Sequence, residues 1–112
     1  MIFHIAEKSV WKACEQLDSY VPSEYLDEGF IHCSKLSQVE KTANNYYKGR
    51  DDLVLLAIDA EKLGAAIRYE NLTGGEEDFP HVYGELHKAA ITQVIDLKWD
   101  DKNKIVGLAE FS

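Results

Sequence analysis

The stretch LVLLAI (residues 53–58) is the feature that most restricts the fold of this chain. All of its residues are apolar, and polar and apolar side chains do not alternate along it. A strand with solvent on one face alternates, whereas a strand covered on both faces is apolar throughout. The stretch therefore predicts the central strand of a sheet that has packed layers on both sides.

Shorter segments predict the other elements. Helices are expected over Val10–Leu17 and from a capping box of Ser37 and Glu40 to about Lys48-Gly49. Further strands are expected at MIFHIA (1–6), GFIHCS (29–34), AAIRYE (65–70), FPHVYG (79–84), 89–97 and 105–111, with polar connections at 18–27, 71–78 and 100–104. Strands and helices that do not alternate regularly indicate an α+β protein.

Length and charge limit the possible partners. A chain of 112 residues is expected to form a single domain, residues 1–112. The net charge of −8 and the absence of a basic run argue against binding to long DNA or RNA, which needs a positive face. A small anionic or nucleotide ligand in a locally basic pocket remains compatible with this charge.

Two further features concern location. No apolar run approaches the length of about 20 residues that spans a bilayer, and the N-terminus does not resemble a signal peptide. The two cysteines, Cys14 and Cys33, are too few for a disulfide framework. We therefore expect a cytoplasmic protein with reduced thiols and no membrane association.

Successive side chains of a strand point to opposite faces, which sorts the polar residues of GFIHCS. His32 and Ser34 share one face, and Cys33 takes the other. His32 and Cys33 therefore diverge and should not form a nucleophile–base pair. Cys33 is expected to be a small core residue.

The same rule places polar side chains opposite apolar ones in three other strands. If these faces converge, they form one polar cleft lined by His4, His32, Ser34, Arg68, Glu70, His81 and Tyr83. An arginine in a mostly apolar strand needs a carboxylate or a ligand anion, so Arg68 would meet phosphate. Two simpler interpretations remain open: Arg68 pairs with Glu70, and His32 is satisfied by protein groups alone.

The spacing of possible ligands bears on metal binding. His4, His32, His81 and Glu70 offer ligand types that zinc accepts. No HExxH or CxxC spacing supports such a site, so the sequence predicts no metal.

At IFHIA, EGFIHCS, IRYE and FPHVYG, over nearly its whole length, the chain resembles a family of small bacterial proteins known as domain of unknown function 952. That family is similar in fold to the ADP-ribosyltransferases, which hold NAD in a cleft of a split β-sandwich. The resemblance implies a mixed, largely antiparallel split β-sheet with two or three short helices.

The resemblance also implies roles for residues. In poly-ADP-ribose-polymerase-like enzymes a His-Gly-Ser/Thr strand opens the NAD site, and His32-Cys33-Ser34 is similar, with Cys33 in place of glycine. His32 would hold a ribose hydroxyl, and Ser34 the nicotinamide amide. A stacking tyrosine and a glutamate that supports the oxocarbenium ion are left open, with Tyr46, Tyr47 or Tyr83 and Glu70 or Glu85 as candidates.

The expected function is binding of NAD or a related nucleotide in the polar cleft. If the protein is an enzyme, it would transfer ADP-ribose or cleave the N-glycosidic bond, with Glu70 and His32 as catalytic residues and NAD as substrate. The alternatives are a non-catalytic binding module for a small anionic metabolite and a structural or interaction protein. The acceptor, the protein partners and the oligomeric state are not predicted.

Overall fold

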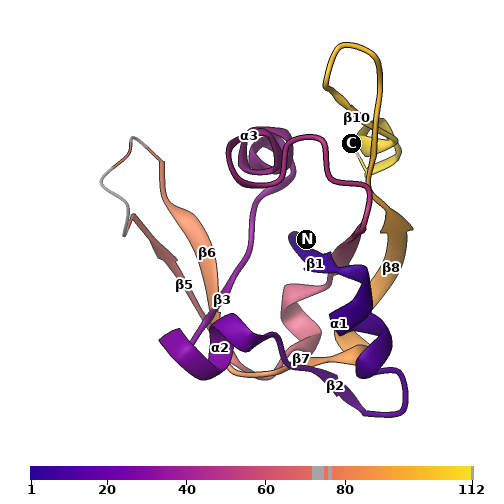
Figure 1. Cartoon of the computed structure of the whole chain (residues 1–112). Helices are drawn as coiled ribbons and strands as arrows, with labels where there is room; N and C mark the ends of the chain where they lie inside the picture. The colour runs from indigo at the N-terminus through magenta and orange to yellow at the C-terminus, as the bar shows by residue number, and fades with distance from the viewer. Residues whose placement is uncertain (72–74, 76, 112) are drawn as a thin grey trace.

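The first of two three-stranded antiparallel sheets carries most of the core of the computed structural model, which describes residues 1–71, 75 and 77–111 (Figure 1). In it β4 (Leu53–Ile58) lies between β1 (Ile2–Glu7) and β8 (Ile91–Asp96). Every β4 side chain is buried, and alternate ones join two hydrophobic clusters on opposite faces of the sheet. The prediction of a central strand covered on both faces is confirmed.

The second sheet has the order β3 (Ile31–His32), β6 (Phe79–Tyr83) and β5 (Ala66–Glu70). It is joined to the first by a bridge in which the backbone N–H groups of Phe3 and Ser34 donate to each other's carbonyl oxygens, at 2.8 and 2.7 Å. Beyond this point the two sheets diverge (Figure 1). The result is an α+β fold in which the Phe3–Ser34 bridge links the two antiparallel sheets.

Helix α3 (Leu36–Tyr46) lies across the space between the two sheets in the view of Figure 1. Its buried side chains include Val39 and Ala43, which pack on the first sheet. The helix begins before Ser37, and Gln38 Oε1 accepts from the backbone N–H of Lys35 at 3.0 Å. The predicted capping box of Ser37 and Glu40 is therefore wrong.

A short helix that the sequence did not predict, α2 (Ser23–Glu28), overlaps the second half of the expected polar connection 18–27 and extends one residue beyond it. Pro22 stands at its N-cap with extended backbone angles, φ −74° and ψ 157°. Gly29 ends it in the left-handed region, φ 84°, which glycine adopts without steric cost. These residues deliver the chain into β3.

The remaining elements are short and correct two further predictions. Helix α1 (Lys8–Ala13) starts and ends earlier than the expected 10–17, and the expected last strand 105–111 splits into β10 (Ile105–Val106) and the 3₁₀ helix η3 (Leu108–Phe111). The other pieces are β2 (Ser19–Tyr20), β7 (Leu86–His87), β9 (Lys98–Trp99), η1 (Ala60–Lys62) and η2 (Lys88–Ala90). Within the expected loop 71–78, residues 72–74 and 76 lie outside the described part.

Among the described residues, no helix has the length and apolar character needed to cross a membrane.

Candidate functional site

A cavity of about 610 Å³ lies between the second sheet, α3 and the middle of β1. Most of the predicted cleft residues line it, namely His4, His32, Ser34, Glu70 and His81. They come from both sheets, which the bridge at Ser34 holds together. Arg68 and Tyr83 do not line this cavity.

Arg68 departs most from its predicted place. It is exposed on β5, an edge strand, and its guanidinium lies over the ring of Tyr83, with Cζ 5.1 Å from the ring centroid. Within the described chain it forms no ion pair with Glu70. Alternation along the strand placed Arg68 on the same face as Glu70, as the structure has it. A long side chain on an edge strand can nevertheless extend toward solvent instead of into the cleft.

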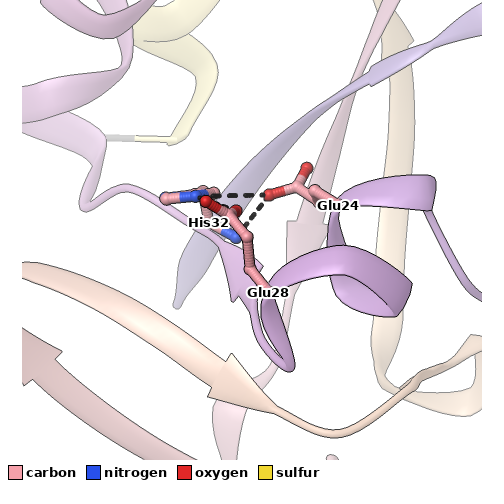
Figure 2. Close-up of side chains that lie close together, drawn as sticks. All are labelled: Glu24, Glu28 and His32. Atoms are coloured by element: carbon pink, nitrogen blue, oxygen red, sulfur yellow. Dashed lines mark hydrogen bonds and ion pairs between the residues drawn. The ribbon is translucent and has the colours of Figure 1, made fainter.

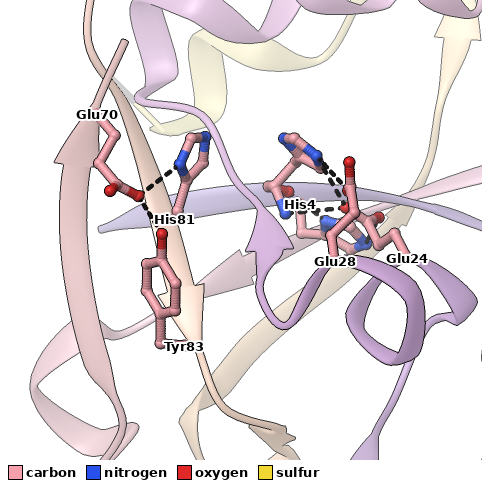
Figure 3. Close-up of polar contacts among 7 residues, drawn as sticks. His4, Glu24, Glu28, Glu70, His81 and Tyr83 are labelled. Atoms are coloured by element: carbon pink, nitrogen blue, oxygen red, sulfur yellow. Dashed lines mark hydrogen bonds and ion pairs between the residues drawn. The ribbon is translucent and has the colours of Figure 1, made fainter. Parts of the chain in front are cut away.

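Glu70 is held by two side chains of β6 (Figure 3). Its Oε1 accepts from Tyr83 Oη at 2.5 Å and from His81 Nδ1 at 3.0 Å. The hydrogen bond from Tyr83, and then the one from His81, lower the pKa of Glu70, and the same bond raises the pKa of Tyr83. Glu70 is therefore an ionised carboxylate in a fixed position at neutral pH.

This arrangement also fixes the tautomer of His81. A carboxylate oxygen only accepts, so Nδ1 of His81 carries the proton that it donates to Glu70. In the neutral ring Nε2 then bears a lone pair. His81 is buried and lines the cavity, so it can accept a proton or a hydrogen bond from a bound molecule.

Phe30 packs the imidazoles into place from one side. Its ring centroid lies 4.9 Å from that of His32, 4.7 Å from that of His81 and 5.3 Å from that of Tyr83. The two imidazoles are themselves 5.2 Å apart in an edge-on arrangement. Close aromatic contacts of this kind restrict ring orientation and add stability beyond area burial.

His4 contributes a buried ring nitrogen without a partner. Nδ1 of His4 donates to the carbonyl oxygen of His32 at 2.6 Å, which leaves the lone pair on Nε2. Nε2 is buried and has no hydrogen-bond partner among the residues that the structure describes, and His4 is 3% exposed. Burial lowers the pKa of His4, an effect that the nearby carboxylate of Glu24 opposes. The imidazole is therefore neutral at neutral pH.

Two glutamates of α2 lie against His32, and the sequence analysis missed both (Figure 2). His32 Nε2 is 2.9 Å from Glu28 Oε2 and 3.8 Å from Glu24 Oε2, and the backbone N–H of His32 donates to Glu24 Oε2 at 3.0 Å. The residues recur every four positions in EYLDEGFIH. A helix ending just before His32 brings such residues together, so this spacing could have revealed the cluster.

Helix α3 and the segment after it supply the opposite wall. Ser34 Oγ lies 3.3 Å from Thr42 Oγ1 across the gap between β3 and the helix. Tyr46 and Tyr47 give this wall aromatic surfaces, and Phe79 of β6 adds a ring from the second sheet. The wall therefore combines hydroxyls with flat apolar rings.

The charged groups around the cavity are mostly negative. Glu24, Glu70 and Glu77 line it together with a single lysine, Lys41, whose Nζ is 3.7 Å from Glu77 Oε2. This balance attracts neutral or positively charged parts of a ligand and repels a bare anion.

Cys33 belongs to the core. It is 3% exposed within an apolar cluster, and burial raises the pKa of its thiol. The prediction that Cys33 is a core residue is confirmed, and part of it also borders the cavity.

Residues 5–94 match the model of a family described as protein of unknown function, DUF952. The chain belongs to the DUF952 family. This DUF952 chain is also similar to protein CC0527 from Caulobacter crescentus, with 32% sequence identity. Its crystal structure gives a TM-score of 0.82, covering 98% of this chain and 96% of that chain, and its solution NMR structure gives 0.80, covering 99% and 95%. The comparison with curated proteins gave no match.

Proposed function

We propose that the cavity binds NAD or a related nucleotide through its nicotinamide riboside end. The volume of about 610 Å³ lies within the usual range for small-molecule sites, about 300–1,000 Å³. Tyr46, Tyr47 and Phe79 offer rings on which a planar heterocycle can stack. The hydroxyls of Ser34 and Thr42 offer partners for the carboxamide of nicotinamide.

The charge of the cavity supports this end of the molecule in particular. The nicotinamide ring of NAD is positively charged, and Glu24 and Glu70 line the cavity as carboxylates. The diphosphate would extend toward the rim, where Lys41 lies. A small metabolite with only negative charges is less well matched, because the cationic Arg68 lies outside the cavity.

The proposal includes an ADP-ribosyltransferase-like arrangement. It is supported by two three-stranded sheets that meet at Phe3 and Ser34 and open beyond them, with the cavity at the opening. The residue that contacts the ribose hydroxyl differs from the one that the resemblance implies. His32 Nε2 lies against Glu28, whereas Nε2 of His81 carries a lone pair, so we assign the ribose hydroxyl contact to His81.

The same groups can serve a reaction at the ribose. The N-glycosidic bond breaks, its electron pair passes to the nicotinamide nitrogen, and positive charge develops on C1′ and the ring oxygen. The fixed carboxylate of Glu70 stabilises that charge without reorganising. A water or hydroxyl acceptor forms the new C1′–O bond and loses its proton to solvent.

The observation that carries the proposal is the ionised Glu70, held by Tyr83 and His81 at the wall of an aromatic, acidic cavity. Thermal unfolding with a ligand panel tests it. NAD and nicotinamide mononucleotide at 100 times their dissociation constants should stabilise the fold by about 2.7 kcal/mol. At the same concentrations as NAD, ADP-ribose and ADP, which lack nicotinamide, should bind more weakly and stabilise the fold less. Equal shifts for all four compounds, or no shift, would refute the proposal.

Two glutamates give a matched pair for the chemical step. Glu70 and Glu85 are close in the chain, but Glu85 is exposed and does not line the cavity. Glu70→Gln should abolish nicotinamide release from NAD while NAD still binds, and Glu85→Gln should retain both. If neither the unaltered chain nor Glu85→Gln releases nicotinamide, the protein binds without catalysis.

A further inference from the structure

We propose that Glu24, Glu28 and His32, with His4 facing the second oxygen of Glu24, form a binding site for one divalent transition-metal ion, with Zn²⁺ as the ion to test first. The site lies at the α2 end of the nucleotide cavity, whose wall includes Glu24, His32 and His4. The site would join α2, β3 and β1 where the two sheets meet (Figures 2 and 3). This inference goes beyond the proposed function and does not depend on it.

The donor atoms of Glu24, Glu28 and His32 lie close enough together for one ion, all within 4.8 Å of one another. Zinc–oxygen and zinc–nitrogen bonds of about 2.0–2.2 Å keep two ligand atoms of one ion within about 4.4 Å of each other. His32 Nε2 is 2.9 Å from Glu28 Oε2 and 3.8 Å from Glu24 Oε2. Glu24 Oε1 is in turn 3.8 Å from His4 Nε2. One carboxylate therefore faces both imidazoles.

His4 supplies the second, independent observation. Its Nε2 is buried without a hydrogen-bond partner, and the nearest acidic oxygen is on Glu24. A buried polar atom left unpaired costs about 1–3 kcal/mol, so a bound partner would remove a real penalty. A neutral imidazole nitrogen with a free lone pair is the form in which histidine binds metals.

The groups around these donors already orient them. The carbonyl oxygen of His32 accepts from Nδ1 of His4, and this bond fixes the tautomer that exposes Nε2 as a ligand. The backbone N–H of His32 donates to Glu24 Oε2 and holds that carboxylate. Hydrogen bonds of this kind to the far side of a ligand are the usual support of protein metal sites.

The donor set selects the class of ion. Two imidazoles with two carboxylates suit Zn²⁺ and the neighbouring transition metals, whereas Mg²⁺ and Ca²⁺ prefer oxygen ligands alone. The two glutamate carboxylates beside His32 also place negative charge in the cluster, which a divalent ion would balance.

Isothermal titration of the metal-free chain with ZnCl₂ tests the site, with MgCl₂ and CaCl₂ as comparison ions. We expect one Zn²⁺ per chain, with much weaker binding of the other two ions. Glu28→Gln should weaken Zn²⁺ binding by about 10-fold or more, since even outer residues of metal sites affect affinity this much. Asp27→Asn is the matched control, because it removes the same charge from the neighbouring exposed position and should leave the affinity unchanged.

Histidine NMR identifies the ligands directly. Zn²⁺ should shift the imidazole resonances of His4 and His32 and leave those of His87, which contacts Ser19 on the β2–β7 pair, unchanged. The proposal is overturned if Zn²⁺ fails to bind at millimolar concentration, if Glu28→Gln binds like the unaltered chain, or if Asp27→Asn weakens binding equally.

The same variant separates this inference from the nucleotide proposal. Glu28 does not line the cavity, so Glu28→Gln should lose Zn²⁺ and still bind NAD. His81→Ala should do the reverse, because His81 lies outside the metal cluster. Loss of both activities in both variants would overturn the separation of the two sites.

Discussion

Phe30 should contribute to stability and to the geometry of the site together, because its ring packs against His32, His81 and Tyr83. It is 9% exposed. Removing a buried phenylalanine costs about 3–5 kcal/mol, and we expect the lower end for Phe30→Ala, about 3 kcal/mol, since water can reach one side. That loss is a large share of the 5–15 kcal/mol that stabilises a small domain.

Phe30→Leu separates the two contributions. Leucine keeps most of the apolar volume but loses the aromatic contacts, each pair being worth about 0.5–1.5 kcal/mol, so we expect a cost of about 1–2 kcal/mol. The free energy of unfolding is measured by urea titration with tryptophan fluorescence. Leu26→Ala on α2, where the side chain is 76% exposed, is the control and should change it by less than about 0.5 kcal/mol. The reasoning fails if Phe30→Ala costs under 1 kcal/mol or if Phe30→Leu costs as much as Phe30→Ala.

Three further predictions concern single groups. The thiol of Cys33 should resist iodoacetamide at pH 8 in the folded protein and react in urea, because burial raises its pKa. In the Cys14→Ser variant Cys33 is the remaining cysteine, so alkylation of this folded variant, counted by mass spectrometry, would contradict the prediction. The lowered pKa of Glu70 contributes stability that is complete above the ordinary pKa of 4.5 and is lost as pH falls through the pKa in the folded protein. Glu70→Gln should therefore make the free energy of unfolding fall less steeply at acidic pH, and an unchanged pH dependence would contradict this. Gly84→Ala should lower the urea midpoint, because a Cβ there would lie 2.8 Å from Ala65 Cβ; an unchanged midpoint would show that the strand shifts freely.

Alternation along strands was the most productive sequence rule. It placed Cys33 opposite His32 and in the core, and it grouped His81 with Phe79 and Tyr83; the structure has Cys33 in an apolar cluster and brings the His32 and His81 rings to 5.2 Å. It succeeded because the period of a strand is fixed by backbone geometry, independent of the neighbouring elements. LVLLAI was informative for the same reason, since burial on both faces leaves no polar position in the repeat.

Alternation does not predict the position of the far end of a long side chain. Arg68 faces the same side as His81, with which it is paired in register, yet its guanidinium lies over Tyr83 and outside the cavity. That outcome depends on strand order, because β5 is an edge strand and its neighbours are known only once the sheet is formed. Alternation along a strand predicts the face on which a side chain lies. Tertiary structure determines which part of that face lines a cavity.

The missed helix had the largest consequence for the site. Pro22 and the acidic residues after it were interpreted as a connection, whereas Pro22 directly precedes α2. A helix of six residues is shorter than the window over which helical periodicity can be detected. Glu24 and Glu28 were therefore absent from the predicted site, although Glu28 Oε2 lies 2.9 Å and Glu24 Oε2 3.8 Å from His32 Nε2.

The most direct test of the nucleotide cavity uses the four histidines of the chain as internal probes. Imidazole ¹H–¹³C correlation spectra of the metal-free protein are recorded during titration with NAD. His4, His32 and His81 line the cavity and should shift in a saturable way with one dissociation constant, while His87 should not move. Titration with ADP should leave His81 unshifted, because ADP lacks the nicotinamide riboside end. If millimolar NAD leaves all four resonances in place, or shifts His87 as much as His81, the cavity is not a nicotinamide nucleotide site.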